Sequence, residues 1–395
     1  MKSGWAIKKL GEVCEEVKDR TSSIGVVLSA YITTDNMLKD CAGVCEAENL
    51  PPKVTSLVKF RKGDVLLSNI RPYLKKVWLA DRDGGASSDV IVFRACSKEM
   101  YPRYIWQSLA RDEFFNYSML NVSGTKMPRG KREWIKQFGI PIPPLPEQKR
   151  IVAKIDAAFE KIDKLKANAE RNLANAKELF QSALEEAMRP KKGWVEKRLG
   201  EVCSKIGSGA TPKGGRNSYR ADGISLIRSM NVYDHAFKYD ELAHINEVQA
   251  KLLENVTIEQ DDVLINITGA SVARCCVVPN DVLPARVNQH VSILRIANRK
   301  VLEPDFLCYS LITKECKVRL LGIGEAGSTR QALTKSDLQF FTISMPMIIE
   351  QRQIVNRLDI LAEKAKLLEQ HYTRLIADCA EMRQSVLREA FEGRL

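Results

Sequence analysis

The final stretch of the chain, about 45 residues from Glu350 to Arg394, carries a heptad repeat of apolar residues. Two rows of positions recur every seven residues and lie four residues apart. The rows are Ile354, Leu361, Leu368, Leu375 and Met382, then Leu358, Ala365, Tyr372, Cys379 and Val386. No proline or glycine interrupts the pattern before Gly393. Because such a repeat leaves an apolar seam that only another helix can cover, it predicts one long coiled-coil helix.

A second segment repeats this helix 203 residues earlier in the chain. Glu147-Gln148-Lys149-Arg150-Ile151-Val152 matches Glu350-Gln351-Arg352-Gln353-Ile354-Val355. Its weaker rows are Ile151, Ala158, Leu165, Asn172 and Leu179, then Ile155, Ile162, Ala169, Ala176 and Ala183. Alanines let a partner helix approach closely. A lone Asn172 on a seam can fix the register, although a position at the margin of the contact is an equal reading.

The two helices have similar lengths, about 65 Å each at ~1.5 Å per residue. We predict that they pair antiparallel and relate the two halves of the chain by a pseudo-two-fold axis. The predicted helix-pairing residues are Ile151, Ile155, Ile162, Asn172, Ile354, Leu358, Leu361, Leu368, Tyr372, Leu375 and Met382.

The rest of the chain is duplicated with a period of about 200 residues. Trp5 and the run Leu10-Gly11-Glu12-Val13-Cys14 return 189 residues later as Trp194 and Leu199-Gly200-Glu201-Val202-Cys203. Asp64-Val65-Leu66 returns 198 residues later as Asp262-Val263-Leu264. The offset grows along the chain because the second copy carries insertions. A period of this length indicates a duplicated domain rather than a solenoid repeat.

Each copy has the pattern of a mixed α/β globule. Strands are predicted at 54–60, 65–67, 77–80 and 90–93, and again at 225–227, 263–267, 275–278 and 291–296. Helices are predicted at 104–116 and 304–320. The predicted fold class is α+β, with two duplicated globules separated by two long antiparallel coiled-coil helices. The predicted segments are 1–146 and 191–349 for the globules, and 147–190 and 350–395 for the helices.

The net charge and the cysteine content limit the kinds of partner and the cellular compartment that we expect. The formal net charge of +12 favours a polyanionic partner. Ten irregularly spaced cysteines without a Cys-x-x-Cys pair, and four scattered histidines, predict reduced thiols and no metal site. The chain shows no apolar signal segment and no run of 18 apolar residues, so we expect a cytoplasmic protein without a membrane partner.

The chain contains no motif that predicts catalysis. Gly207-Ser208-Gly209 lacks the Gly-Lys-Ser/Thr ending of a phosphate-binding loop. Asn69-Ile70-Arg71-Pro72-Tyr73 is similar to the Asn-Pro-Pro-Tyr motif of amino-group methyltransferases, but its first proline is absent and no glycine-rich cofactor loop precedes it. Asp261 and Asp262 could hold a metal ion, although paired acids before a strand more often form a turn. We therefore predict that the chain is not an enzyme.

Loops in both copies are rich in side chains that suit DNA. Arginine can bridge the two major-groove acceptors of guanine, asparagine or glutamine can pair with adenine, and lysine neutralises phosphates. Any one such residue is as readily a solvated surface residue, but equivalent loops of both copies carry them. The predicted DNA-binding residues of the first copy are Arg71, Tyr73, Lys75, Lys126, Arg129, Lys131 and Arg132. Those of the second copy are Arg216, Tyr219, Arg228, Asn231, Arg274, Asn288, Gln289, Arg330 and Gln331.

A proline-rich lead and the Glu-Gln opening of each long helix resemble a known family. The run Ile140-Pro141-Ile142-Pro143-Pro144-Leu145-Pro146, followed by Glu147-Gln148, closely resembles the signature of the specificity subunits of type I restriction–modification enzymes. The second copy departs from it with Met347-Ile348-Ile349 but keeps Glu350-Gln351. The openings at Trp5 and Trp194 and the Gly-Ser/Thr segment before each helix also match. The resemblance covers essentially the whole chain.

The resemblance implies a non-catalytic protein that binds double-stranded DNA. Each globule would be a target recognition domain that reads one half of a split, asymmetric site. The helices would set the spacer and dock two methyltransferase subunits, which bind S-adenosylmethionine and methylate adenine. Restriction subunits, which use ATP and Mg, would join them, while this chain itself would need no cofactor.

Two other functions compete with this one. A non-enzymatic coiled-coil scaffold would bind proteins through its globules. A fused restriction–methylation enzyme would need the cofactor loop and Asn-Pro-Pro-Tyr motif that this chain lacks.

Overall fold

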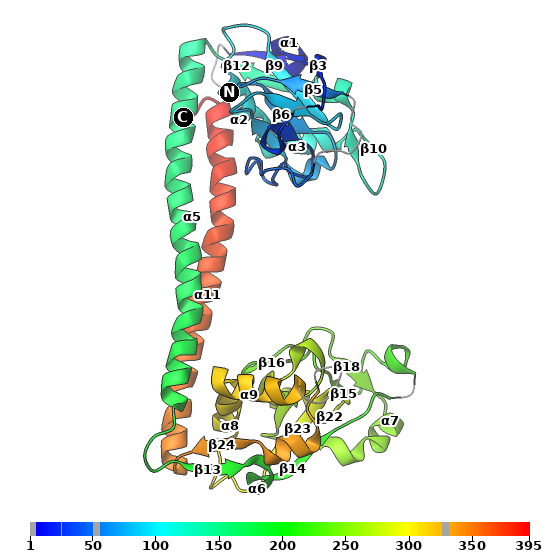
Figure 1. The fold of residues 1–395 in the computed structure, drawn as a ribbon, viewed down its shortest axis with the longest axis vertical. Helices are drawn as coiled ribbons and strands as arrows, with labels where there is room; N and C mark the ends of the chain where they lie inside the picture. The colour runs from blue at the N-terminus through cyan, green and yellow to red at the C-terminus, as the bar shows by residue number, and fades with distance from the viewer. Residues whose placement is uncertain (1–4, 25, 50–55, 213, 326–331) are drawn as a thin grey trace. The chain divides into compact units, whose positions relative to one another are not determined.

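The computed structural model describes residues 5–24, 26–49, 56–212, 214–325 and 332–395 (Figure 1). The chain divides into two compact units: unit 1 is Met1–Arg171 with Tyr372–Leu395, and unit 2 is Asn172–His371. Helices α5 (Leu145–Met188) and α11 (Ile348–Phe391) each contribute to both units and begin two residues earlier than predicted. The four-segment division made from the sequence stays a prediction.

Unit 1 has two four-stranded sheets within its described residues. The first is antiparallel, in the order β2 (Cys14–Glu16), β9 (Val90–Ala95), β6 (Val65–Ser68), β7 (Val77–Leu79). The second has the order β3 (Arg20–Thr21), β5 (Leu57–Phe60), β8 (Gly84–Ala86), β4 (Tyr31–Ile32), with β4 parallel to β8. A short ribbon pairs β10 (Val122–Ser123) with β11 (Arg129–Gly130). The helices of this globule are α1 (Leu10–Val13), α2 (Pro102–Leu109), α3 (Asp112–Met119) and α4 (Arg132–Ile135).

Unit 2 repeats this plan. Its first sheet is β14 (Cys203–Ser208), β23 (Val291–Ile296), β20 (Val263–Asn266), β21 (Cys275–Val277), and its second is β18 (Ala243–Ile245), β15 (Ile224–Ile227), β22 (Ala285–Val287), β19 (Thr257–Ile258). A ribbon joins β16 (Val232–Tyr233) to β17 (Ala236–Phe237). The helices are α6 (Leu199–Val202), α7 (Glu247–Leu252), α8 (Pro304–Ile312), α9 (Lys314–Glu325) and α10 (Lys335–Phe340). The first sheets share one strand order, and β5, β8 and β4 of the second sheet correspond to β19, β22 and β15, which confirms the duplication; β3, β18 and the two ribbons differ between the units.

The strand predictions are confirmed to within two residues at seven of their eight positions. The eighth strand, β5, begins at Leu57, and residues 54 and 55 lie outside the described part of the chain. The two helix predictions were wrong in one respect, because each region forms two helices. Arg111 and Thr313 adopt extended backbone conformations between α2 and α3 and between α8 and α9. These breaks turn the chain so that both members of each pair can pack against the core.

A buried glutamine explains the Glu-Gln opening of both long helices. In unit 1 the Gln148 amide donates to the carbonyls of Glu99 and Pro143, and its oxygen accepts the N–H of Tyr101 at 2.9 Å. In unit 2 Gln351 bonds in the same way to Val301, Pro346 and Glu303. Each glutamine therefore fastens the start of a long helix to the loop before α2 or α8. Because both glutamine side chains are buried, no water could replace these hydrogen bonds, and their loss would lower the stability of the fold.

The paired terminal strands explain two other sequence signatures. Strand β1 (Ala6–Lys9) runs antiparallel to β12 (Gly139–Ile142), which contains the proline-rich lead into α5. Strand β13 (Val195–Arg198) pairs in the same way with β24 (Thr342–Met345) before α11. The tryptophan openings and the helix leads, far apart in sequence, are therefore neighbours in each unit.

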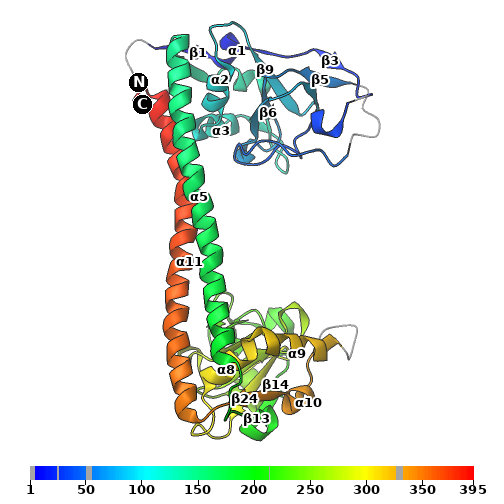
Figure 2. The ribbon, with the colours of Figure 1, turned by 60° about the vertical axis from the view of Figure 1, so that its left-hand side comes forward.

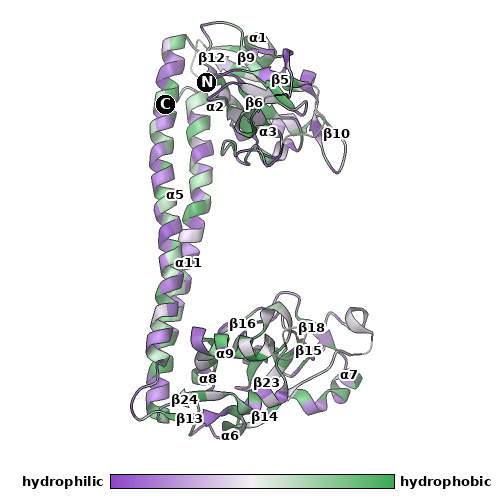
Figure 3. Ribbon diagram, in the orientation of Figure 1, coloured by the Kyte–Doolittle hydropathy of each residue, from purple (hydrophilic) through white to green (hydrophobic). Residues whose placement is uncertain are grey.

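The long helices pair antiparallel inside each unit. In unit 1 the start of α5 and the end of α11 share one core, through Ile151, Ile155, Leu387 and Phe391. In unit 2 the end of α5 and the start of α11 share another, through residues that include Leu184 and Leu358. Figures 1 and 2 both show the helices side by side next to the unit 1 globule, and Figure 3 shows hydrophobic and hydrophilic residues alternating along both.

The rows that start at Ile155 and Leu358 are the more buried ones, although Ile151 of the other row is also buried and Tyr372 is only half-buried. The buried residues are Ile151, Ile155, Ile162, Ala169 and Ala176 on α5, and Leu358, Ala365 and Cys379 on α11. Half-buried at the margin are Asn172, Ile354, Leu361, Tyr372 and Leu375. Leu368 and Met382 are each 39% exposed, and Leu179 is 52% exposed. Small residues in the more buried rows, such as Ala169, Ala176 and Ala365, let the two backbones approach closely. The larger leucines of the other rows, such as Leu368, therefore lie further out.

No helix in the described ranges is long and apolar enough to cross a membrane. All ten cysteines lie in the described part of the chain and carry free thiols. Burial raises the pKa of several of them, Cys203 and Cys41 to about 12, so these thiols are inert at neutral pH.

Candidate nucleic-acid interface

Three loops of unit 1 converge beside the β6–β7 turn. The backbone N–H of Arg71 donates to the carbonyl of Pro128 at 2.7 Å, and Ile70 forms a bridge with Arg129. On the other side, the N–H groups of Asp40 and Cys41 donate to the carbonyls of Leu74 and Lys75. Backbone bonds therefore gather residues 36–45, 69–76 and 124–131 into one surface, which we call the unit 1 loop cluster.

The unit 1 loop cluster is rich in exposed cations. Arg71, Lys126, Arg129 and Lys131 are exposed, as is Tyr73. Arg129 pairs with Asp89 at 3.3 Å, and both side chains stay largely in solvent. Desolvation, together with the nearby charges of Lys39 and Arg71, lowers the pKa of Lys76, although Asp35 acts in the opposite direction. Exposed cations gathered on one surface favour a polyanionic partner.

Two predicted cations of unit 1 are already paired within the globule. Lys75 Nζ lies 2.6 Å from a carboxylate oxygen of Asp112 on α3. Arg132 forms an ion pair with Glu16 and donates to the carbonyl of Ser88 at 2.7 Å. Burial would raise the pKa of Glu16, but hydrogen bonds from Lys136 and Arg132 lower it below its ordinary value. The side chains of Lys75 and Arg132 are therefore held by ion pairs within the globule.

Four polar side chains lie together beside the β20–β21 loop of unit 2. The Thr268 hydroxyl hydrogen-bonds to Nδ1 of His290, and the Thr211 hydroxyl donates to the amide oxygen of Gln289. The Gln289 amide nitrogen lies 3.0 Å from Nε2 of His290. These four residues, which we call the unit 2 polar cluster, come from three loops and expose both donors and acceptors. Such a surface suits base edges rather than phosphates.

Two predicted arginines of unit 2 lie over tyrosine rings. The Arg274 guanidinium is 4.6 Å from the ring centroid of Tyr233, and that of Arg228 is 5.3 Å from the ring of Tyr219. Arg228 also donates to the backbone carbonyl of Glu241. Stacking of this kind holds a guanidinium in one orientation.

Two predicted DNA-binding residues of unit 2, Asn231 and Asn288, are buried and bonded within their own loops. Asn231 is fully buried, and its amide bonds to the backbone of Arg228 and Lys238 at 3.1 and 2.9 Å. Asn288 is also buried, and its oxygen accepts the N–H of His290 at 3.0 Å. Both asparagines shape loops from within and cannot reach a DNA base while these loops stay folded. Asparagine suits such local backbone bonds as well as it suits adenine, so composition alone could not separate the two roles.

Three predicted residues cannot be placed. Arg330 and Gln331 lie outside the described residues, and so does the side chain of Arg216.

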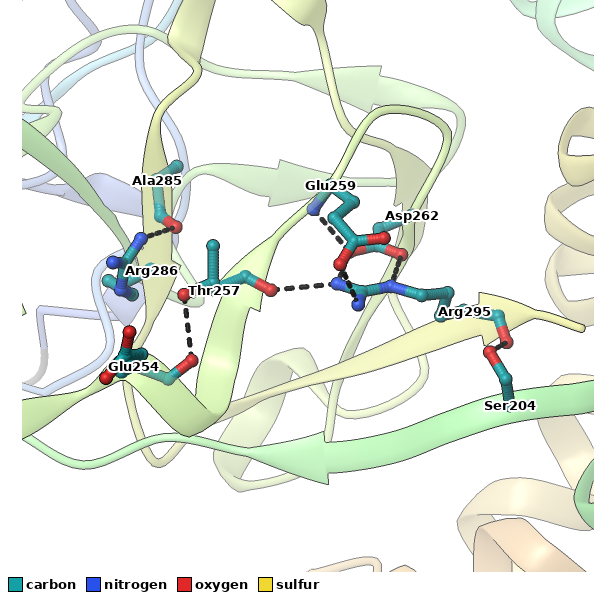
Figure 4. Close-up of polar contacts among 8 residues, drawn as sticks. All are labelled: Ser204, Glu254, Thr257, Glu259, Asp262, Ala285, Arg286 and Arg295. Carbon is teal, nitrogen blue, oxygen red and sulfur yellow. Dashed lines mark hydrogen bonds and ion pairs between the residues drawn. The ribbon is translucent and has the colours of Figure 1, made fainter.

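The Asp261–Asp262 pair, considered from sequence as metal ligands or a turn, forms a turn held by arginine (Figure 4). Both carboxylate oxygens of Asp262 accept hydrogen bonds from Arg295 at 2.8 Å, and one accepts the N–H of Glu259 at 2.7 Å. Asp261 pairs instead with Arg299. Described histidines, cysteines and acids form no cluster suited to a metal ion.

Unit 1 contains the same clamp. Arg94 donates to both oxygens of Asp64 at 2.8 and 2.6 Å, and Asp64 also accepts the N–H of Arg61. Both aspartates are buried at the start of the central strands β6 and β20, where an unpaired charge would be costly. The clamps are therefore structural and hold the strand that leads into each candidate interface.

Sequence reasoning missed Asp89 and His290, which stand directly before β9 and β23. The N–H of Asn69 donates to the Asp89 carbonyl, and that of Ile267 donates to the His290 carbonyl. The sequence held a signal for them, because Asp89 and His290 lie 201 residues apart and each directly precedes the same predicted strand in its copy. Neither residue belongs to a recognised motif, and their equivalence rests on strand pairing.

Comparison with known proteins places the chain in a family. A family model described as the type I restriction modification DNA specificity domain matches residues 2–173 and 191–375. The specificity subunit of the type I restriction enzyme EcoBI from Escherichia coli is 25% identical over 302 residues, which cover 70% of this chain and 62% of that subunit. The chain thus covers less than two thirds of the length of this relative.

Two solved structures match the fold over its whole length. One, from work on complex assembly and conformational transition of the type I R-M system, has a TM-score of 0.82 and 26% identity, and the match covers 100% of this chain and 99% of that one. The HsdS subunit from Thermoanaerobacter tengcongensis has a TM-score of 0.60 and 25% identity, with 100% and 98% covered. With both of its globules matched by the family model, the chain belongs to the type I restriction–modification specificity family, whose known role is DNA sequence recognition.

Proposed function

We propose that this chain is the DNA-recognition subunit of a type I restriction–modification complex, and that each unit reads one half of a bipartite, asymmetric site. One observation carries the proposal most strongly. The two units hold equivalent loops on the same strand frame, yet the β6–β7 loop of unit 1 carries the exposed Arg71 and Tyr73 where the β20–β21 loop of unit 2 carries Gly269 and Ser271. Different chemistry on one frame suits the recognition of two different half-sites.

In this proposal the chain has no catalytic role and binds no cofactor. Two methyltransferase subunits dock on the long helices and bind S-adenosylmethionine, and restriction subunits supply ATP- and Mg-dependent cleavage. The helices set the length of the unread spacer between the half-sites. Support comes from the family match and from the paired helices, whose outer faces carry exposed apolar side chains such as Ile360 and Leu367.

The proposal is tested by methylation of plasmid DNA in the presence and absence of the methyltransferase subunit. The chain alone is expected to transfer no labelled methyl group, and the two together are expected to methylate adenine at a bipartite site. Methyl transfer by the purified chain alone would contradict the proposal. A chain that binds the methyltransferase but shows no salt-dependent DNA binding would instead be a scaffold.

A further inference from the structure

The β6–β7 hairpin of unit 1 and the β20–β21 hairpin of unit 2 correspond residue by residue in their strand register. Val65 pairs with Leu79 in the first and Val263 with Val277 in the second, and every paired position differs by 198. The turns close alike, since the N–H of Ser68 donates to Lys76 and that of Asn266 donates to Arg274. Residues 68–76 and 266–274 are therefore equivalent nine-residue loops.

The equivalence extends to two unusual backbone conformations. Arg71 and Lys75 both have φ of 51°, in the left-handed region. Their counterparts Gly269 and Ala273 have φ of 74° and 66°. Side chains with a Cβ disfavour this region, whereas glycine adopts it freely. Gly269 therefore suits its position, while unit 1 keeps an arginine where the same loop would be more stable with glycine.

The two strained residues of unit 1 differ in what their side chains do. Lys75 is half-buried and paired with Asp112 at 2.6 Å, so a contact inside the globule accounts for it. Arg71 is exposed, and no described residue forms a hydrogen bond or ion pair with its guanidinium. Strain that is kept at an exposed residue without an internal partner points to a ligand outside the fold.

Building on the proposed function, we propose that Arg71 reads a base edge in the half-site of unit 1, as a specificity-determining residue that unit 2 lacks. The chemical partner is the pair of major-groove acceptors of a guanine, which matches the guanidinium fork. Unit 2, with Gly269 at the same position, reads its half-site through other residues, including the unit 2 polar cluster.

A base contact explains the position of Arg71 better than a phosphate contact does. A phosphate needs only a positive charge within reach, and Lys126 and Lys131 supply such charges from backbone without positive φ. Bidentate reading needs a fork aimed in one direction. Pro72, the bond from the Arg71 N–H to Pro128, and the bond from the Leu74 N–H to the Arg71 carbonyl together hold the backbone of Arg71 in one conformation.

The test uses the full chain together with its methyltransferase subunit and measures the methylated motif by sequencing. Arg71→Gly is expected to reduce the preference at one base pair of one half-site by roughly 10- to 100-fold, and to leave the other half-site unchanged. Arg71→Lys keeps the charge but loses the fork, so it is expected to relax the same base pair. Arg71→Gly should also melt no lower than the native chain, because glycine relieves the backbone strain.

Ala273→Gly is the matched control, since it removes a Cβ at a residue of positive φ in the equivalent loop of unit 2 and is expected to leave the motif intact. Uniform weakening on all sequences, with a sharp motif retained in Arg71→Gly, would overturn the proposal in favour of a phosphate contact. A sharp motif with full activity would overturn it as well. If the native complex methylates no bipartite site, the proposed function itself fails, which is a distinguishable result.

Discussion

Asp156 on α5 and Asp359 on α11 are equivalent residues, but the two globules meet them with opposite charges. In unit 1, Arg103 forms an ion pair with Asp156 at 2.9 Å, and the Gln107 amide donates to the same carboxylate. In unit 2 the residue equivalent to Arg103 is a second carboxylate, Asp305. Both junctions lie between a globule and a long helix, and in unit 1 an arginine is paired with the helix carboxylate.

In unit 2 a histidine and a tyrosine lie against the two carboxylates. Nε2 of His235 lies 3.8 Å from Asp305 and 3.7 Å from Asp359, and its ring stacks on Tyr309 at a centroid distance of 4.2 Å. The Tyr309 hydroxyl donates to Asp359 at 2.7 Å. The duplicated frame therefore tolerates exchange of charge where a globule meets a long helix, while the buried glutamines Gln148 and Gln351 and the aspartate–arginine clamps are the same in both units.

The largest expected effect comes from the part that the units share. Asp64→Ala and Asp262→Ala each remove the carboxylate from a buried arginine pair, and each should destabilise its own unit by about 3–5 kcal/mol. Hydrogen exchange, read separately for β6 and β20, measures the loss. Asp261→Ala is the control, because its pair with Arg299 is largely exposed and should cost about 1 kcal/mol or less. Equal losses at Asp261 and Asp262 would contradict the clamp.

A change of charge at Arg103 tests whether the two junctions differ because of their charges. Arg103→Asp gives unit 1 the carboxylate pair of unit 2 without its histidine, so it should cost about 1–2 kcal/mol, less at high salt because the pair is partly exposed. Arg103→Gln is the control that removes the cation without adding a charge. Urea unfolding of both variants at two salt concentrations separates repulsion from simple loss of the ion pair. Identical stabilities of the two variants would show that charge does not matter there.

A smaller effect is expected from the pH dependence of the unit 2 junction. Burial, with help from Asp359, raises the pKa of Asp305 to about 6. The folded state therefore binds more protons than the unfolded state between about pH 4 and 6, and this carboxyl contributes stability at low pH that is lost as pH rises through 6. Asp305→Asn should make the chain slightly more stable at pH 7.5 and should have little effect near pH 4.

Burial acts on His235 in the opposite sense. It lowers the pKa of the imidazole, although Asp359 partly offsets this, so protonation of the unfolded state destabilises the fold as pH falls below about 6.5. His235→Gln should therefore lose less stability than the native chain between pH 7.5 and 5.5. Urea unfolding across this range measures both variants, and parallel profiles for native and mutant chains would exclude a titrating junction.

Much of the frame could be predicted from the sequence because it depends on periodicity. The heptads, the strand patterns and the repeated openings indicate which residues are buried, and the spacing of buried residues indicates whether a segment forms a helix or a strand. The break of α2–α3 at Arg111 was missed, since a single extended residue leaves no mark in the apolar pattern.

The candidate interface was harder to predict, because it depends on how loops meet. The burial of Asn231, the left-handed backbone of Arg71 and the placement of His290 beside Thr268 are tertiary facts. A polar residue in a loop has the same sequence signature whether it bonds to its own backbone, to a neighbour or to DNA.

Exchange of the first globule tests most directly the claim that each unit reads its own half-site. Residues 1–140 are replaced with the equivalent domain of a relative, and the methylated motif is sequenced with the methyltransferase subunit present. If each unit reads its own half-site, one half-site changes to that of the relative, while the other half-site keeps its sequence. A change in both half-sites, or in neither, would contradict independent reading by the two units.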